Sequence, residues 1–284
     1  MAALGPLPTF VGIGAPKAGT TWLYEMLDAH PDIGMSPRRK EVHFFRRHYD
    51  RGPDWYRTFF EGLDGCAAIG EFTTHYLYNP ALSERIAESA PTIDKLIVLL
   101  RDPITRARSH WAFRVRVEGY PGTFEAFLDE RPEAIDWGRY GHHLARLQPW
   151  IDRGALLALI YEEATADVAG TQRQLGAFLG VDPGRFPTGA GRHRRNARFE
   201  PRFGPLYTAA VRAGIWLRGL DLDPLVNALK RAGVKRLFER EGGAALPPMR
   251  PETARRLAET FGPDVDRLEA LLGRDLAVWR DTWT

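Results

Sequence analysis

Cysteine, long apolar runs and excess charge are all scarce in this chain of 284 residues. Cys66 is the single cysteine, so no disulfide can form within the chain. No apolar run reaches the roughly eighteen residues that a transmembrane helix needs. The first residues also lack the charged and then apolar segments of a secretory signal. We therefore expect a cytoplasmic protein without stable membrane insertion, and a lone cysteine fits a reducing compartment.

The charge balance bears on whether the chain binds nucleic acid. The 39 Lys and Arg residues nearly cancel the 36 Asp and Glu residues, which leaves a net charge of +3. A nucleic-acid binder that depends on bulk positive charge is therefore not expected. The basic residues are clustered in the sequence at 38–40, 46–47 and 192–195. Local clusters with a small net charge suit a small polyanionic ligand.

Residues 10–24 form the most informative stretch. An apolar run ends at Gly14, a short loop with Lys17 and Gly19 follows, and from Thr20 the apolar residues recur at helical spacing. This pattern predicts a strand, a glycine-rich loop and a helix. Such a unit directs backbone N–H groups and the positive end of the helix dipole at an anion.

The same loop departs from a Walker A motif in one respect. Gly14, Gly19 and Thr21 fit the motif, but Thr20 stands where the motif requires lysine, and the lysine lies inside the loop as Lys17. A lysine there would lie over the leaving oxygen of a bound phosphate ester. The alternative is an ordinary strand–helix turn that binds nothing.

Strand and helix patterns alternate along much of the chain, which predicts a three-layer α/β fold with a central parallel sheet and helices on both faces. We predict a single domain over 1–284, with a core at about 8–200, a C-terminal helix within 250–280 and a helical insertion at 203–248. The predicted strands are 10–14, 33–35, 67–73, 95–100 and 155–161. The predicted helices include 52–60, 80–90, 103–117, 123–130, 137–153, 168–179, 203–232 and 252–272.

The run 95–100 is typical of a strand buried on both faces. Asp102 and Pro103 then suit the N-cap and first turn of a helix. Arg101 would therefore lie at the carboxyl end of a central strand, where ligands of open α/β sheets bind. Ser109 follows on the helix, and an arginine and a hydroxyl can hold one phosphate from two sides. The alternative for Arg101 is a structural salt bridge.

Glu41 and His43 form a candidate proton-transfer pair. In an extended chain these two side chains and Phe45 share one face. The alternatives are a surface salt bridge for Glu41 and a packing role for His43.

Two motifs together carry a resemblance to sulfotransferases that use 3′-phosphoadenosine 5′-phosphosulfate (PAPS). Residues 16–22, Pro-Lys-Ala-Gly-Thr-Thr-Trp, resemble the 5′-phosphosulfate loop of that family. Arg101 and Ser109 resemble its 3′-phosphate motif, with the same spacing. Residues 40–45 and 52–56 resemble segments of the heparan-sulfate N- and 3-O-sulfotransferases. The end of the chain, about 252–279, is similar to the last helix of the family.

The resemblance implies that PAPS is the sulfuryl donor and PAP the product, and that no metal is needed. It implies that Lys17 stabilises charge on the bridging oxygen and that Glu41 is the base, with His43 as the second choice. The residues expected to bind the nucleotide are Lys17, Ala18, Gly19, Thr20, Thr21, Trp22, Arg101, Ser109, Arg192 and Arg195. For Arg192 and Arg195 the alternative is a solvated charge run.

The acceptor is less defined. We expect a small molecule or sugar with a hydroxyl or amine, contacted by Phe72, Thr73, Tyr76 and Arg114. The chain departs from the heparan-sulfate enzymes at Phe72, where those enzymes place a lysine, so their substrate contacts do not transfer directly. The alternatives are a P-loop kinase or NTPase, and a non-catalytic anion-binding or membrane-surface module built on 203–232, which allows peripheral membrane contact. Oligomeric state stays open.

Overall fold

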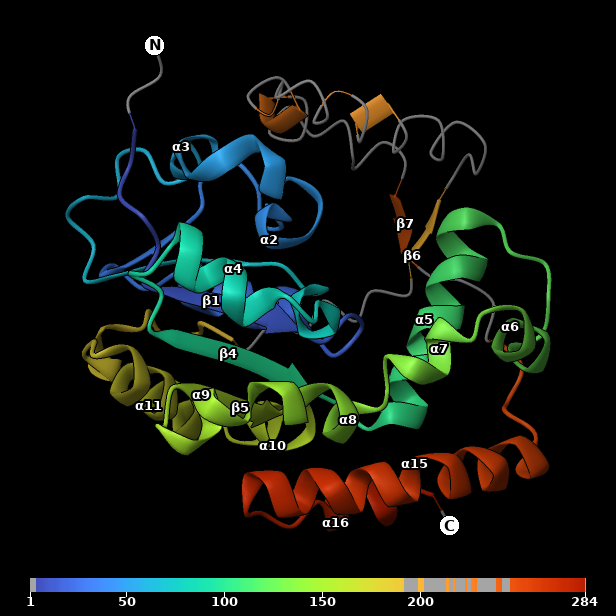
Figure 1. The fold of residues 1–284 in the computed structure, drawn as a ribbon. Helices are drawn as coiled ribbons and strands as arrows, with labels where there is room; N and C mark the ends of the chain where they lie inside the picture. The colour runs from blue at the N-terminus through green and yellow to red at the C-terminus, as the bar shows by residue number, and fades with distance from the viewer. Residues whose placement is uncertain are drawn as a thin grey trace.

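The structure is a computed structural model that describes residues 4–191, 199–201, 213–214, 217, 223, 226–228, 239–241 and 246–283. Its centre is an all-parallel sheet in the order β2-β3-β1-β4-β5 (Figure 1). The strands are β1 (Phe10–Gly14), β2 (Ile33–Met35), β3 (Ala68–Phe72), β4 (Lys95–Leu100) and β5 (Leu156–Ile160). The predicted α/β class with a central parallel sheet is confirmed.

Helices follow nearly every strand. On the amino-terminal half they are α1 (Thr20–Asp28), α2 (Phe44–Arg47), α3 (Gly52–Arg57), α4 (Leu82–Ser89) and α5 (Pro103–Glu118). The later helices are α6 (Phe124–Glu130), α7 (Glu133–Asp136), α8 (Tyr140–Leu144), α9 (Gln148–Asp152), α10 (Tyr161–Ala166), α11 (Val168–Leu179), α15 (Pro251–Leu272) and α16 (Ala277–Arg280).

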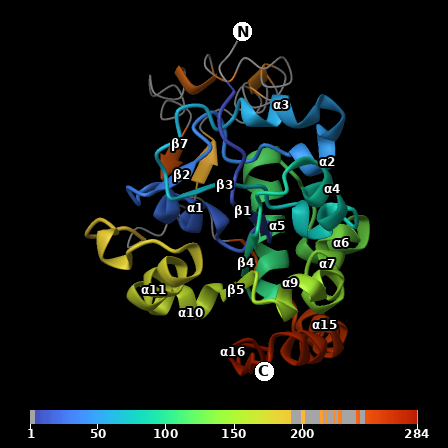
Figure 2. The same cartoon turned by 60° about the vertical axis from the view of Figure 1, so that its left-hand side comes forward.

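Period-2 alternation divides the strand residues between two apolar cores. On β1, Phe10 packs with α1 and α11 on one face, whereas Val11 and Ile13 pack on the other face with α4, α8, α9 and α15. The strand β4 alternates in the same way, with Ile97 on the α1 side and Val98 opposite. Figure 2 shows α11 and α4 on opposite sides of the sheet. This is the expected three-layer arrangement, because both faces of a parallel sheet must be covered.

The strand order explains why two segments far apart in sequence meet. β1 and β4 are neighbours at the centre of the sheet, with Gly14 opposite Val98. The N–H of Ala15 donates to the carbonyl of Leu99 at 2.8 Å. The loop after β1 and the turn after β4 therefore leave the same edge of the sheet side by side, and Arg101 follows directly after β4.

The α5 helix begins as the sequence predicts. The Asp102 carboxylate accepts a hydrogen bond from the N–H of Thr105 at 2.6 Å, and Pro103 occupies the first turn. Thr123 caps α6 in the same way, accepting from the N–H of Ala126 at 3.2 Å. The helix predicted over 80–90 begins later, at Leu82, and Asn79 instead accepts from the N–H of Ala81.

Two predicted elements are wrong. Residues 137–153 do not form one helix but break into α8, a 3₁₀ turn at Ala145–Leu147, and α9. Pro149 has no N–H to donate back into the preceding turn, and it occupies the start of α9 instead. The extended segment predicted as far as Phe45 ends earlier, because α2 begins at Phe44.

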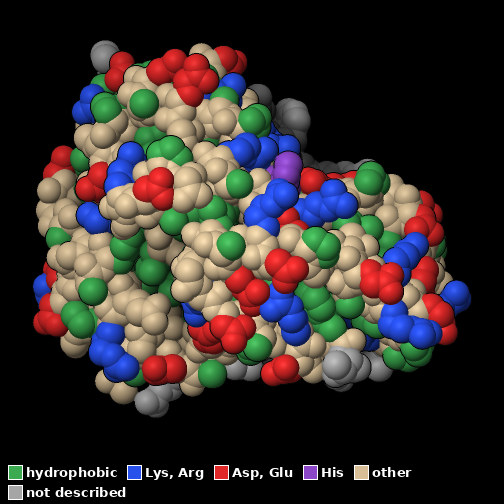
Figure 3. Space-filling view, turned by 60° about the horizontal axis from the view of Figure 1, so that its bottom comes forward, with side chains coloured by type: hydrophobic (Ala, Val, Ile, Leu, Met, Phe, Trp, Pro, Cys, Tyr) green, Lys and Arg blue, Asp and Glu red, His purple; other side chains and the backbone are tan. Residues whose placement is uncertain are grey.

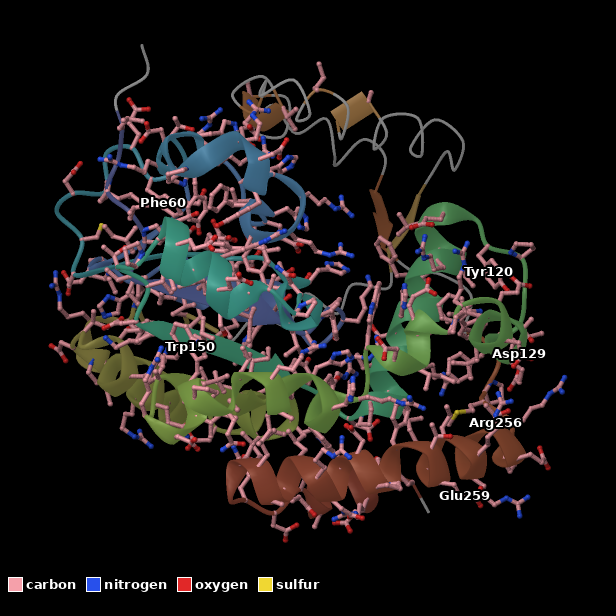
Figure 4. The ribbon with its side chains drawn as sticks, viewed as in Figure 1. Phe60, Tyr120, Asp129, Trp150, Arg256 and Glu259 are labelled. Atoms are coloured by element: carbon pink, nitrogen blue, oxygen red, sulfur yellow. The ribbon has the colours of Figure 1, made fainter. Side chains whose placement is uncertain are left out.

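The C-terminal helix is present as predicted and packs on α8 and α5. Its Asp264 carboxylate accepts hydrogen bonds from the N–H groups of Gly141 and His142, each at 2.8 Å, and so caps the start of α8. Arg256 on α15 also approaches Asp129 on α6 at 3.6 Å (Figure 4). The helix ends at Gly273, which has left-handed backbone angles.

Most of the predicted insertion at 203–248 lies outside the described residues. Where described, β6 (Phe199–Pro201) pairs antiparallel with β7 (Glu239–Glu241), a pairing that the sequence pattern did not predict. This pairing joins the segment just before the predicted insertion to residues 239–241 within it, and β6 contacts α5 (Figure 1).

The described surface shows no signature of a membrane span. None of the described helices is long and apolar enough to cross a bilayer. On the face shown in Figure 3, acidic and basic side chains are interspersed, and basic side chains gather beside a histidine at a step in the surface. This mixture agrees with the small net charge.

Candidate active site

A cavity of about 490 Å³ opens at the carboxyl ends of β1 and β4. Six separate segments supply its walls: the loop after β1 with the start of α1, the loop before α2, the residues after β3, the turn after β4 with α5, the residue after α7, and the start of α10. The lining residues are Pro16, Lys17, Gly19, Thr20, Thr21, Trp22, Lys40, Glu41, Thr74, His75, Arg101, Ser109, His110, Phe113, Arg114, Glu118, Trp137 and Tyr161.

The loop after β1 holds its lysine in an unusual backbone conformation. Lys17 has a φ of 69°, a left-handed value that residues other than glycine seldom adopt and that recurs at functional sites. Its ammonium nitrogen lies 3.3 Å from the centroid of the Phe113 ring on α5. The loop thus directs Lys17 across the cavity rather than into solvent.

Burial lowers the pKa of Lys17 to about 7. Glu118 and Glu41 oppose this shift, whereas Arg114 and Arg106 add to it. The ammonium therefore lacks a compensating partner strong enough to offset its desolvation. A bound anion at this position would restore the charged form.

Gly19 joins the loop to α1 and has a φ of 96°. A Cβ atom there would lie 2.4 Å from the Tyr161 ring, so only glycine fits beside this side chain. The Tyr161 ring in turn lies 5.0 Å from the guanidinium carbon of Arg101. Gly19, Tyr161 and Arg101 therefore form a packed series that links the two predicted phosphate-binding segments.

Arg101 is suited to an anionic ligand. Its Nε atom is buried and has no hydrogen-bond partner among the described residues. Ser109, two turns along α5, lines the same cavity. Buried polar groups are normally paired, so an unpaired guanidinium nitrogen in a cavity wall indicates that a ligand supplies the acceptor.

The first turn of α1 has no side-chain cap, which leaves the positive end of the helix facing the cavity. Thr20 and Thr21 line the cavity, as predicted for nucleotide-binding residues. Ala18 instead is fully buried, and its N–H donates to the carbonyl of Ala15. The N–H of Trp22 likewise donates to Gly19, and the Trp22 indole N–H donates to the carbonyl of Gly191 at 2.6 Å.

Glu41 and His43 lie together on the loop before α2. The Nε2 atom of His43 is 3.5 Å from a carboxylate oxygen of Glu41, and the Thr74 hydroxyl donates to the same oxygen at 3.2 Å. Burial raises the pKa of Glu41, whereas burial and the nearby Arg47 lower the pKa of His43 to about 3. Glu41 lines the cavity, whereas His43 is not among the lining residues.

Aromatic rings and imidazoles form a further part of the cavity wall. The His110 ring stacks on Trp137 with a centroid separation of 5.1 Å, and His75 meets Trp137 edge-on at 5.0 Å. Burial and neighbouring arginines lower the pKa of His75 to about 4 and that of His110 to about 3. Both imidazoles are therefore neutral near pH 7, whereas the ion-paired side chains of Arg114 and Glu118 line the cavity beside them.

Comparison with known proteins identifies the family. Residues 8–197 match the sulfotransferase domain. The chain belongs to the sulfotransferase family. It is 35% identical over 145 residues to a membrane-associated sulfotransferase of Dictyostelium discoideum, an alignment that covers 48% of this chain and 30% of that protein. It is 32% identical over 188 residues to heparan sulfate glucosamine 3-O-sulfotransferase 3A1 of Mus musculus, covering 62% of this chain and 46% of that enzyme.

A solved sulfotransferase from Alicyclobacillus acidocaldarius superposes with a TM-score of 0.67 at 26% identity and covers 96% of this chain and 98% of that chain. Family membership and fold therefore agree with the resemblance drawn from the loop and the Arg101–Ser109 pair. The chain spans less than half the length of the curated relatives described here.

Within this sulfotransferase fold, the predicted acceptor contacts need correction. Phe72, Thr73 and Tyr76 are fully buried. The Thr73 hydroxyl donates to the buried Glu71 carboxylate at 2.7 Å, and the Tyr76 hydroxyl accepts from the N–H of Phe45 at 3.3 Å. Phe72 is buried because β3 has a neighbouring strand on each side and covered faces, and Thr73 and Tyr76 are buried in the turn that follows β3. Only Arg114 of the predicted acceptor set lines the cavity.

Arg192 and Arg195 lie outside the described residues, although Gly191 meets Trp22 beside the cavity. Sequence reasoning also missed several lining residues: Lys40, Thr74, His75, His110, Phe113, Glu118, Trp137 and Tyr161. The Lys40–Glu41 pair was visible within a quoted motif, but nothing in the sequence placed its lysine against α1. Within the described part of the chain, no group of three His, Cys, Asp or Glu side chains is arranged to hold a metal ion.

Proposed function

We propose that this chain transfers a sulfuryl group from PAPS to the hydroxyl or amine of a small molecule or sugar, giving PAP and a sulfated product. The observation that carries the proposal is the convergence of Lys17, Glu41, Arg101 and Ser109 on one cavity of about 490 Å³. These residues come from segments that are up to about ninety positions apart, so their meeting is a property of the fold.

The residues present fit a doubly phosphorylated nucleotide. The uncapped start of α1, the Thr20 and Thr21 hydroxyls and Lys17 would hold the 5′-phosphosulfate, because free N–H groups at a helix start bind phosphate. Arg101, whose Nε lacks a partner, and Ser109 would hold the 3′-phosphate. When bound, PAPS supplies the activated sulfuryl group.

Each part of the reaction is then assigned to a residue of this chain. Lys17 neutralises charge that develops on the leaving phosphate oxygen. Glu41 accepts the proton of the attacking hydroxyl, and its raised pKa suits a general base. His43 stays neutral and orients Glu41, since it contacts that carboxylate without lining the cavity. Glu41 as the base is the first choice made from the sequence, whereas the sequence offered His43 only as the alternative base.

The rings of His75, His110 and Trp137 in the cavity wall favour a ring-bearing acceptor. Neutral imidazoles and the Trp137 indole offer flat surfaces on which an aryl or sugar ring can lie. Arg114, the one predicted acceptor contact in this wall, is already paired with Glu118.

Radiolabelled PAPS and a panel of phenols, aliphatic alcohols and neutral glycosides would test the proposal. We expect labelled product with at least one ring-bearing acceptor and release of PAP. The Glu41→Gln variant should lose about 10²–10⁴-fold in turnover and keep its PAP affinity. An unaffected rate in this variant would assign the base elsewhere, with His43→Gln as the next variant. Absence of PAP binding to the native chain would contradict the function itself.

A further inference from the structure

Lys40 is a second cation at the phosphosulfate loop that the motifs did not assign. It lies on the loop between β2 and α2, next to Glu41, and lines the cavity. Its ammonium nitrogen is 3.2 Å from the Thr20 hydroxyl oxygen and 3.3 Å from that of Thr21. Lys40 therefore crosses from one wall of the cavity to the loop on the other.

The surroundings of this ammonium are largely apolar. The Phe72 ring centroid lies 5.8 Å away and that of Tyr24 6.0 Å away, so two ring faces support the charge. The described part of the chain places no carboxylate within 4.0 Å of the nitrogen. Burial lowers the pKa of Lys40, and the more distant charges of Glu41 and Glu25 oppose that shift. A desolvated cation whose partners are two neutral hydroxyls is available for an anion.

Lys40 and Lys17 reach different parts of the phosphosulfate loop. Lys17 points from the middle of the loop toward Phe113 on α5, whereas Lys40 lies at the end of the loop beside the proposed base. A group in transfer must lie between the loop that holds the donor phosphate and the carboxylate that takes the acceptor proton. The ammonium of Lys40 borders that space.

We propose that Lys40 contacts the sulfuryl oxygens during transfer; this inference rests on the proposed function. The acceptor oxygen forms a bond to sulfur, the acceptor proton passes to Glu41, and the bond between sulfur and the bridging oxygen breaks with its electron pair on the phosphate of PAP. Lys40 keeps its protons and stabilises the equatorial sulfuryl oxygens. Lys40 thus supplies a cation from the loop before α2, beside the Phe72 ring.

A comparison of PAP binding with PAPS turnover distinguishes this role from a structural one, because PAP lacks the sulfuryl group that Lys40 is proposed to contact. In the Lys40→Met variant, we expect kcat/KM for PAPS to fall about 10²–10³-fold, while the Kd for PAP changes less than about threefold. Lys40→Gln keeps a hydrogen-bonding group near Thr20 and Thr21 but removes the charge, so it should show the same loss with an unchanged Tm. Lys95→Met is the matched control, since Lys95 lies at the amino end of β4 beside Asp94 and does not line the cavity.

If the Lys40 variants lost affinity for PAP and PAPS to the same extent, the inference would be overturned. Lys40 would then have only a structural role, linking the loop before α2 to the start of α1. Full activity of Lys40→Gln would also overturn the inference. Failure of the native chain to bind either nucleotide is a separate outcome, which would contradict the proposed function and not the placement of Lys40 alone.

Discussion

The lowered pKa of Lys17 predicts how PAP affinity depends on pH. In the free chain this pKa is about 7, and a bound phosphate would raise it toward the ordinary lysine value of roughly 10.4. PAP therefore binds the protonated form preferentially. Affinity is complete below pH 7 and is lost as the pH rises, because binding must then also take up a proton.

The magnitude follows from the fraction of Lys17 that is charged. Half of it is charged at the pKa of about 7, and roughly one part in a hundred two pH units higher, so the Kd for PAP should rise about 50-fold between pH 7 and pH 9. This corresponds to about 2.3 kcal/mol. The phosphate groups of PAP contribute little, since their second pKa lies at about 6.

Isothermal titration calorimetry between pH 6 and pH 9 measures this directly. Near pH 8 the binding heat should report uptake of nearly one proton when buffers of different ionisation enthalpy are compared. The Lys17→Arg variant is the control, because a guanidinium stays charged throughout and should flatten the curve. A flat curve for the native chain, or an equal slope in Lys17→Arg, would refute the reasoning.

Two further predictions concern the residues around the loop. Gly19→Ala should destabilise the chain by about 1–3 kcal/mol and weaken PAP binding, because the new Cβ atom would clash with the Tyr161 ring, which contacts Arg101. Gly180→Ala is the control for the backbone cost alone, because Gly180 has a φ of 74° and a Cβ atom there would meet nothing within 4 Å. Thermal unfolding of the two variants compares their stabilities. Arg101→Met should weaken PAP about 10–100-fold while AMP, which lacks the 3′-phosphate, changes little, and equal losses for both nucleotides would contradict the 3′-phosphate assignment.

Local sequence patterns predicted much of the fold. The buried run 95–100, the Asp102 cap and the glycine-bracketed loop each follow from residue chemistry within a short window, and the structure contains all three. The apolar stripe over 137–153 misled the prediction because it continues across Pro149, while the backbone cannot. The stripe correctly indicated burial, since Tyr140, Leu144 and Leu147 are core residues.

The site was predictable only in part, for a physical reason. Loop motifs specify which residues meet a ligand from their own segment, so Lys17 and Arg101 could be proposed. Contacts between segments depend on sheet order, and no local pattern reports that Lys40 reaches Thr20 and Thr21 or that Tyr161 fills the space beside Gly19. Phe72 and Tyr76 show the converse error. These aromatic residues were predicted to contact the acceptor, but both side chains are buried, Phe72 at the end of β3 and Tyr76 in the 3₁₀ turn that follows.

Two tryptophans after α15 contact the elements beside Arg101. The Trp279 indole N–H donates to the Glu162 carboxylate at 3.0 Å, and the Trp283 indole N–H donates to the Asp102 carboxylate, beside Arg101. Glu162 also accepts from the N–H of Asp102 at 3.2 Å. Trp279 and Trp283 thus stabilise the turn that carries Arg101, the residue proposed to bind the 3′-phosphate. Removal of either indole should therefore loosen the turn that carries Arg101, more than a hundred and seventy positions earlier in the chain.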